Sequence, residues 1–239
     1  MTHEPRSLQT CLAAFAALSL MSVANAETVT VTDAANNNYG NANGVAIDFD
    51  ATTGLAANWT PDLTSQEYSI NSVTLYQSTG LPGSGSEPST ATVRLGVYTT
   101  LTGETVGGFQ GVSTNTIDLS TVALGTPFTF NFSGISVTPG MNAGTGADIR
   151  YFAFQIGDTA ITDLRAESTR VPIRRIDAET GSFTDELAAV IQASGNTSSG
   201  LVGNRAPEYS ATITPVPEPS AAIMLLGGAG ILGVLRRRC

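Results

Sequence analysis

The amino-acid sequence predicts an all-β protein whose main domain is an antiparallel β-sandwich. Between residues 27 and 216, apolar residues occur in short alternating runs, the pattern of half-buried strands. Clusters of Gly, Pro, Ser and Asn separate these runs and predict surface loops. The chain has 239 residues, of which 41% are apolar and 13% charged, so one domain with a buried core accounts for its length.

Eight strands are expected in this domain, at residues 28–32, 45–49, 69–77, 90–99, 128–132, 135–137, 150–156 and 209–214. Two of them alternate cleanly, and side chains two residues apart share one face of a strand. We therefore expect two apolar faces to point into the core, formed by Ala91, Val93, Leu95 and Val97 on one strand and by Phe128, Phe130 and Phe132 on the other.

The remaining segments of the domain are expected as loops and one short helix. Turn-forming residues dominate 36–44, 78–89 and 139–146, which predicts three surface loops. Residues 184–192, with the sequence TDELAAVIQ, combine a capping residue, early acids and an apolar stripe, which predicts a helix. We find no internal repeat and no second domain.

The first 26 residues predict a signal peptide. An apolar run at 11–23 follows Arg6, and Ala24 and Ala26 place small residues where a signal peptidase inspects the chain. We expect export through the Sec translocon and a mature chain that begins at Glu27. An uncleaved anchor or a buried core helix is the alternative.

The C-terminal segment predicts a membrane helix with a basic end. Residues 220–235 are 16 uncharged residues, which as a helix would span roughly 24 Å, short of the ~30 Å hydrocarbon core but workable with local thinning. Arg236, Arg237 and Arg238 follow and are expected to stay in the cytoplasm. Three prolines at 215–219 predict an extended linker. The expected order is signal peptide 1–26, ectodomain 27–214, linker 215–219, transmembrane helix 220–235 and basic tail 236–239.

This tail resembles a PEP-CTERM sorting signal, the substrate signal of bacterial exosortases. The resemblance depends on Val216-Pro217-Glu218-Pro219, the Gly-rich apolar segment and the final arginines, in that order. It implies that an exosortase in the inner membrane recognises Pro217-Glu218-Pro219, cleaves nearby and passes the ectodomain to the cell surface or an exopolysaccharide matrix. A Pro-rich linker before an ordinary single-pass anchor is the alternative. Cys239 lies outside the pattern.

A second resemblance covers residues 68–156. This part of the chain resembles the jelly-roll sandwiches of surface-anchored bacterial proteins, which are akin to carbohydrate-binding modules. The resemblance depends on expected strands at 70–76, 93–98, 128–132 and 151–154 and on a Pro139-Gly140 turn. The resemblance implies a jelly-roll fold and carries no diagnostic ligand residue.

Composition excludes most catalytic chemistry. The chain has no lysine, its single histidine is His3, and its two cysteines are Cys11 and Cys239, so residues 27–216 contain none of these types. Serine and cysteine hydrolase mechanisms, P-loops, Schiff bases and histidine- or thiolate-held metals are therefore excluded there. The same segment has seven arginines against 18 acidic residues, a net charge of −11, which argues against nucleic acid as a partner.

Carboxylate chemistry remains possible. Asp48 and Asp50 share one face of an expected strand, and either a carboxylate-only glycosidase or two solvent-facing acids would explain them. Together with Asp33, they also form the best candidate for calcium, which takes only oxygen ligands. Turn-forming Asn and Gly explain the loop at 33–44 more simply, and we expect no other cofactor.

Two further groups are candidates for carbohydrate contact. Trp59 with Tyr39, Tyr68, Tyr76 and Tyr98 would form a platform for sugar rings, although a core role is the simpler interpretation. Arg165, Arg170, Arg174 and Arg175 would bind an acidic polysaccharide, although a solvated face paired with Asp163, Glu167, Asp177 and Glu179 is the simpler interpretation.

Two function classes follow. The leading hypothesis is a non-enzymatic extracellular structural or adhesive protein associated with exopolysaccharide. The alternative is a secreted carbohydrate-binding module or a glycosidase that works through carboxylates alone.

Overall fold

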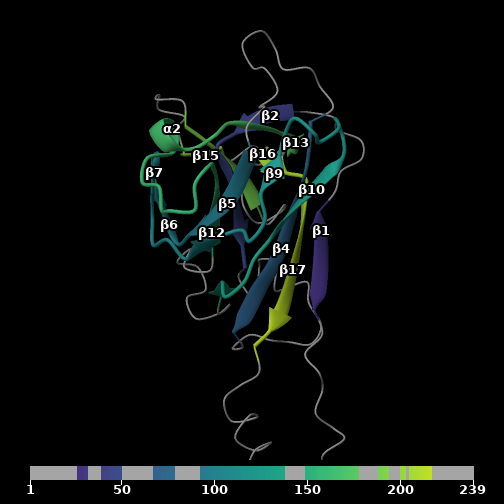
Figure 1. Cartoon of the computed structure of the whole chain (residues 1–239), viewed down its shortest axis with the longest axis vertical. Coiled ribbons are helices and arrows are strands. Elements are labelled where there is room, and N and C mark those ends of the chain that lie inside the picture. Colours follow the sequence, from purple (N-terminus) through teal and green to yellow (C-terminus); the bar gives the residue numbers. More distant parts are fainter. Residues whose placement is uncertain are drawn as a thin grey trace, which may run out of the picture.

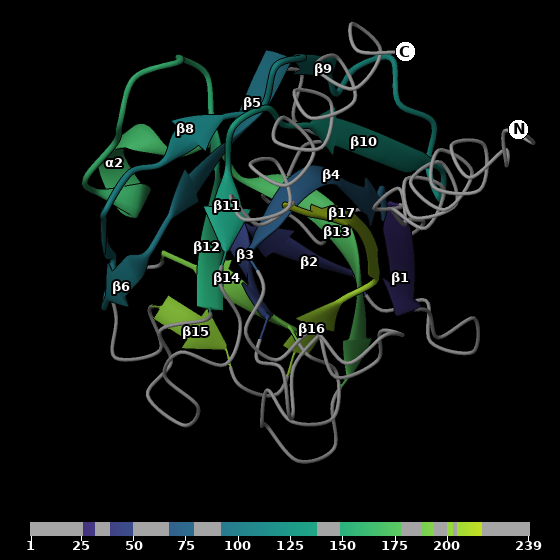
Figure 2. The same ribbon diagram turned by 90° about the horizontal axis from the view of Figure 1, so that it is seen from below.

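Alternating apolar residues give most strands of this protein one buried face, and two antiparallel sheets bury those faces against each other. The structure is a computed structural model, and it describes residues 26–31, 39–49, 67–78, 92–137, 149–177, 188–193, 200–202 and 205–216. Figure 1 shows the strands in these ranges, and Figure 2 shows β8, β12 and β14 on one side of the molecule and β10, β4 and β1 on the other.

The five-stranded sheet runs in the order β1 (Glu27–Val31), β17 (Tyr209–Pro215), β4 (Tyr68–Tyr76) and β10 (Pro127–Asn131). The short strand β11 (Ser136–Val137) pairs with the start of β4. Every pairing in this sheet is antiparallel.

The seven-stranded sheet runs in the order β15 (Gly200–Val202), β14 (Ala188–Gln192), β3 (Gly44–Asp48), β12 (Ile149–Gln155), β5 (Thr92–Tyr98) and β8 (Gly111–Val112), with β9 (Ile117–Asp118) also paired to β5. Two smaller sheets complete the described strands: β16 (Arg205–Pro207), β13 (Val171–Asp177) and β2 (Tyr39–Ala42) form one, and β6 (Thr100–Thr102) and β7 (Thr105–Gly107) form the other.

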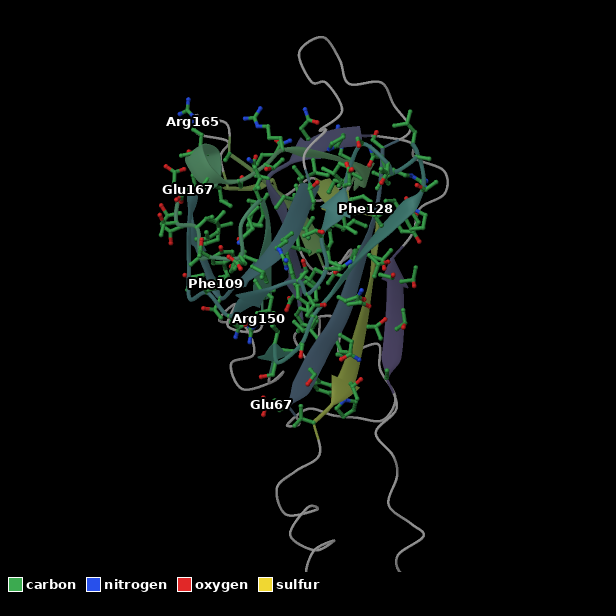
Figure 3. All side chains as sticks on the ribbon, viewed as in Figure 1. Glu67, Phe109, Phe128, Arg150, Arg165 and Glu167 are labelled. Atoms are coloured by element: carbon green, nitrogen blue, oxygen red, sulfur yellow. The ribbon has the colours of Figure 1, made fainter. Side chains whose placement is uncertain are left out.

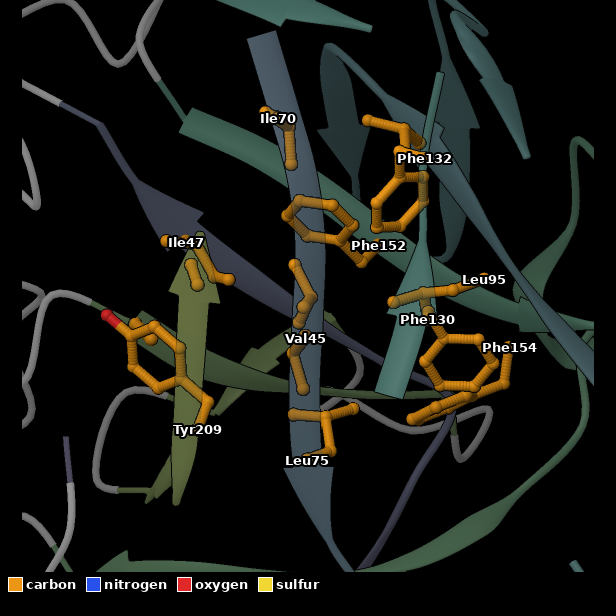
Figure 4. Close-up of a cluster of buried hydrophobic side chains, with 14 of the residues drawn as sticks. Val45, Ile47, Ile70, Leu75, Leu95, Phe130, Phe132, Phe152, Phe154 and Tyr209 are labelled. Atoms are coloured by element: carbon orange, nitrogen blue, oxygen red, sulfur yellow. The ribbon is translucent and has the colours of Figure 1, made fainter. Parts of the chain in front are cut away.

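The main core lies between the two large sheets. Phe130 on β10 meets Phe154 on β12 with ring centroids 6.2 Å apart, and Phe132 meets Phe152 at 5.9 Å (Figure 4). The inward faces expected from the sequence are confirmed where they are described: Val93, Leu95, Val97, Phe128, Phe130 and Phe132 are all buried. Ala91 lies outside the described residues.

A second, smaller core covers the other face of the seven-stranded sheet. There Tyr98 and Ala153 pack with Val106 of β7 and with Leu164 of the short helix α2 (Leu164–Glu167). Asp163 caps this helix by accepting hydrogen bonds from the backbone N–H groups of Arg165 and Ala166. Figure 1 shows α2, β6 and β7 together at one edge of the molecule. The central strands of this sheet are therefore buried on both faces.

All eight expected strands are present, with ends shifted by a few residues, so the all-β fold class is confirmed. The jelly-roll topology stays a prediction. The helix expected at 184–192 is wrong, because its described part is strand β14, with Ala188, Ala189, Val190 and Ile191 all buried. This strand lies between β15 and β3 in a sheet that is covered on both sides, and burial of both faces overrides its helical propensity.

The loop expected at 36–44 is also wrong in its described part. Residues 39–42 form β2, which pairs with β13, and Gly44 opens β3. A Cβ at Gly44 would collide with the backbone oxygen of Phe152, so the close approach of β3 and β12 requires a glycine at this position. In the sequence, Gly44 contributes to a predicted loop, whereas in the structure it lies within a sheet and allows β3 and β12 to approach closely.

Candidate sorting site at the end of the last strand

The C-terminal strand β17 brings the chain to the predicted sorting tail. It is an interior strand of the five-stranded sheet, paired with β1 on one side and β4 on the other. Pro215 lies opposite Tyr68 of β4, and Ile213 lies opposite Glu27 of β1. β17 therefore ends where β4 and β1 begin, at the lower end of the molecule in Figure 1.

Val216 is the first residue after β17, and it is still tied to the sheet. Its backbone N–H donates a 2.8 Å hydrogen bond to the carbonyl oxygen of Glu67, the residue before β4. One residue inside the strand, the side-chain amide of Asn71 donates to the Thr214 hydroxyl at 2.5 Å. The ordered sandwich thus extends up to the residue before Pro217-Glu218-Pro219. The sequence does not reveal Glu67 as the partner of Val216, because the two are far apart in the chain.

The predicted signal-peptidase site lies at the same end of the sheet. Ala26 is exposed and directly precedes β1, whose first residue Glu27 is the cross-strand partner of Ile213. The chain therefore enters and leaves the sandwich on neighbouring strands of one sheet.

The other predicted sorting residues fall outside the described part of the chain. These are Ala24, Pro217, Glu218, Pro219, Arg236, Arg237 and Arg238. Among the described residues, no helix has the length and apolar character that crossing a membrane requires. The span expected at 220–235 lies beyond them, so it stays a prediction.

The candidate calcium site is only partly described. Asp48 is the last residue of β3 and lies opposite Ile149 of β12, whereas Asp33 and Asp50 lie outside the described residues. Within the described ranges, no group of three or more His, Cys, Asp or Glu side chains comes together. Calcium therefore stays a prediction, as does the pairing of Asp48 with Asp50.

The solvated arginine face expected from the sequence is confirmed only in part, because Arg165 and Arg170 are exposed whereas Arg174 is half-buried. Arg174 on β13 pairs with Glu208 at 3.0 Å, with side chains only 14% and 6% exposed, and its guanidinium lies 5.8 Å from the ring centre of Tyr76. Arg170 donates to the carbonyl oxygen of Ala193 at 2.6 Å. The expected partners Asp163 and Glu167 accept backbone N–H groups around α2. The actual partner Glu208 is distant in sequence and reaches Arg174 because Glu208 N–H bonds to the Arg174 carbonyl.

The aromatic platform is wrong for two of its tyrosines. Tyr68 and Tyr98 are fully buried, and burial raises the pKa of the Tyr98 hydroxyl. Tyr76 is partly exposed, beneath Arg174. Trp59 and the side chain of Tyr39 lie outside what the structure describes.

Comparison with known proteins identifies the tail. Residues 215–238 match the PEP-CTERM protein-sorting motif. No curated protein and no solved structure matches the chain. The match begins at Pro215, the last residue of β17, so the motif starts where the sandwich ends. The chain therefore carries a PEP-CTERM sorting motif, which marks it for an exosortase and for export to the cell surface or extracellular space.

Proposed function

We propose that this protein is a non-enzymatic structural or adhesive component of the cell surface or extracellular matrix. In this proposal the Sec pathway exports the chain, the helix at 220–235 holds it transiently in the inner membrane, and an exosortase then processes it. The observation that carries the proposal is that the motif starts at Pro215, the final residue of the last strand. Cleavage beyond Val216 would release the sandwich with every described strand intact.

The roles of several acidic side chains support a non-enzymatic function. Asp163 caps α2, and Glu208 pairs with Arg174. Backbone N–H groups of Asp163 and Thr162 donate to Glu167 and lower its pKa. A glycosidase needs a general acid whose pKa is raised, so Glu167 has the opposite property. Residues 27–216 also lack the His, Cys and Lys side chains of other hydrolytic mechanisms.

The sorting step is tested in the full chain, expressed in its native host. Replacing Pro217, Glu218 and Pro219 together by alanine should leave an uncleaved membrane species that retains the residues from Arg236 to Cys239. Intact-mass spectrometry of membrane and surface fractions measures this directly. Pro127→Ala, at an exposed proline outside the motif, is the matched control and should be processed normally.

The opposite result is equally clear. If the wild-type protein on the cell surface still carries Arg236 to Cys239, the tail is a plain membrane anchor and the processing proposal is wrong. A hydrolysis assay with purified polysaccharides, run on the released protein, separates the structural role from the glycosidase alternative, because only an enzyme would release reducing ends.

A further inference from the structure

The outward face of the five-stranded sheet carries a regular arrangement of hydroxyl and amide side chains. Directly opposed residues on neighbouring antiparallel strands point to the same side of a sheet. The strand register aligns two rows of four residues, hereafter the hydroxyl array: Thr30, Ser210, Thr74 and Thr129 in the first row, and Thr28, Thr212, Ser72 and Asn131 in the second. Each row crosses β1, β17, β4 and β10.

The hydroxyl array faces away from the core. Its neighbours along the strands, such as Ala211, Val73 and Phe130, are fully buried, so the alternation places the array on the opposite face. None of the eight side chains is buried: Thr28, Thr30 and Asn131 are exposed and the other five are partly exposed. Figure 3 shows side chains standing out from β1, β17 and β4 on this face.

The array is ordered before any partner arrives. The hydroxyls of Thr28 and Thr212 are 2.7 Å apart, and those of Thr74 and Thr129 are 2.8 Å apart. β-branched side chains such as Thr also have restricted χ1 rotation. The hydroxyl groups are thus held at spacings set by the sheet, about 4.8 Å between strands and about 6.7 Å between the two rows. Little side-chain entropy would be lost on binding.

At its β10 edge, the sheet next to the array is closed to an added strand. The side-chain oxygen of Asn115 accepts from the backbone N–H of Asn131 at 2.8 Å, and its amide donates to the carbonyl oxygen of Thr129 at 2.8 Å. Asn115 therefore occupies the hydrogen-bonding positions that an added strand would use on β10. A partner would meet the side chains of the face and not the backbone of this edge.

The chemistry of the array selects the class of partner. All eight side chains are uncharged, in a chain whose net charge is −9. Hydroxyl groups both donate and accept hydrogen bonds, as sugar hydroxyls do. Among these eight side chains an acidic polymer would find no positive charge, and a protein partner would find no apolar centre of the kind that stable interfaces bury. We propose that the hydroxyl array binds a neutral polysaccharide, an inference that rests on the extracellular location in the proposed function.

Removal of the hydroxyls tests this inference. The full chain is expressed in its host, and the mature product is recovered from the cell surface. Electrophoretic retardation is measured in gels containing hydroxyethyl cellulose, dextran or galactomannan as neutral polymers and alginate as an acidic one. We expect at least one neutral polymer to retard the wild type, and alginate not to. The fourfold variant replaces four threonines by valine, which keeps the branched shape of each side chain: Thr30→Val, Thr74→Val, Thr129→Val and Thr212→Val. Its affinity for the neutral polymer should fall at least about tenfold.

Two further variants keep the test decisive. Thr100→Val with Thr102→Val and Thr105→Val removes three exposed threonines from β6 and β7, and this matched control should bind as the wild type does. Thr129→Glu places one charge inside the array and should also weaken binding of the neutral polymer. For each variant, a melting temperature equal to that of the wild type shows that the protein still folds. The inference is overturned if no neutral polymer retards the wild type or if the fourfold variant is retarded equally. It is also overturned if light scattering shows a dimer that the array variants abolish, because the face would then bind a second copy.

Failure of this inference is distinguishable from failure of the proposed sorting. The array variants should reach the surface with a normally processed tail, because their substitutions lie outside residues 215–238. If the wild-type surface protein still carries Arg236 to Cys239, while a neutral polymer retards it and the fourfold variant loses that retardation, the proposed processing alone is contradicted. Normal sorting with unchanged retardation in the fourfold variant would contradict the array alone.

Discussion

The hydroxyl of Tyr98 on β5 donates a 2.8 Å hydrogen bond to the side-chain oxygen of Gln155 on β12, and both residues are fully buried. The same hydroxyl accepts the backbone N–H of Ile161 at 2.9 Å, while the Gln155 amide donates to the carbonyl oxygens of Gly157 and Thr159. This pair fixes the segment after β12 over the outer face of the seven-stranded sheet, the face that the second core covers.

Removing the Tyr98 hydroxyl is expected to destabilise the fold. Tyr98→Phe keeps the ring but leaves the Gln155 oxygen and the Ile161 N–H without this buried partner, which should lower the free energy of unfolding by about 1 to 3 kcal/mol. Urea denaturation measures the change. Tyr76→Phe, at a partly exposed tyrosine, is the control and should change stability by less than about 0.5 kcal/mol. Equal effects of the two substitutions would contradict the role of the buried pair.

Packing between the sheets is tested at Phe130. This residue is fully buried and contacts both Phe128 on its own strand and Phe154 across the core. Phe130→Ala should cost about 3 to 5 kcal/mol, because both the transfer free energy and the cavity contribute. Asn131→Ala, the exposed next residue, provides the comparison and should have little effect. An unchanged denaturation midpoint for Phe130→Ala would show that β10 does not face the core.

The strands that the sequence predicts carry one of two local patterns. Some alternate between a buried and an exposed face, and the others have a dense apolar run between turn residues. Strand β13 escaped prediction because Arg174 and Arg175 interrupt its apolar pattern, and the acid that compensates Arg174 is the distant Glu208. Strand β14 lacks alternation because both of its faces are covered. Both β13 and β14 form because residues distant in the sequence bury or pair with them. The local sequence pattern holds no information about those distant residues.

The candidate sites divide in the same way. The sorting motif is contiguous, from Pro215 onward, so its residues are recognisable without a structure. The hydroxyl array comes from four strands that are far apart in the chain, and Thr28 and Thr129 share one face of the sheet only through the registers of β17 and β4. Serine and threonine in separate strands carry no signal until the register is known.

The partly buried ion pair Arg174–Glu208 predicts a non-additive pair of substitutions. Arg174→Met alone removes one partner of the 6%-exposed Glu208, at 3.0 Å, which should cost about 1 to 3 kcal/mol. The double variant Arg174→Met with Glu208→Met removes both charges and should be less destabilised than the sum of the single changes. Denaturant unfolding of all four proteins forms a double-mutant cycle. A coupling free energy near zero would show that the pair is an exposed contact of little consequence.

Glu167, the last residue of α2, predicts a pH dependence of stability. The Glu167 carboxylate accepts the backbone N–H groups of Thr162 and Asp163 at 2.7 and 2.8 Å, and these bonds hold its pKa below the ordinary value. A carboxyl whose folded pKa is depressed stabilises the fold fully above its unfolded pKa, about 4.3, and this contribution is lost as the pH falls through the folded pKa. The variant Glu167→Gln cannot lose a charge on acidification. Wild type should therefore be more stable than Glu167→Gln at pH 7, and thermal melts should show this difference shrinking as the pH is lowered below about 4. A difference that stays constant from pH 7 to acid would show that the carboxylate charge contributes nothing to holding the segment before α2.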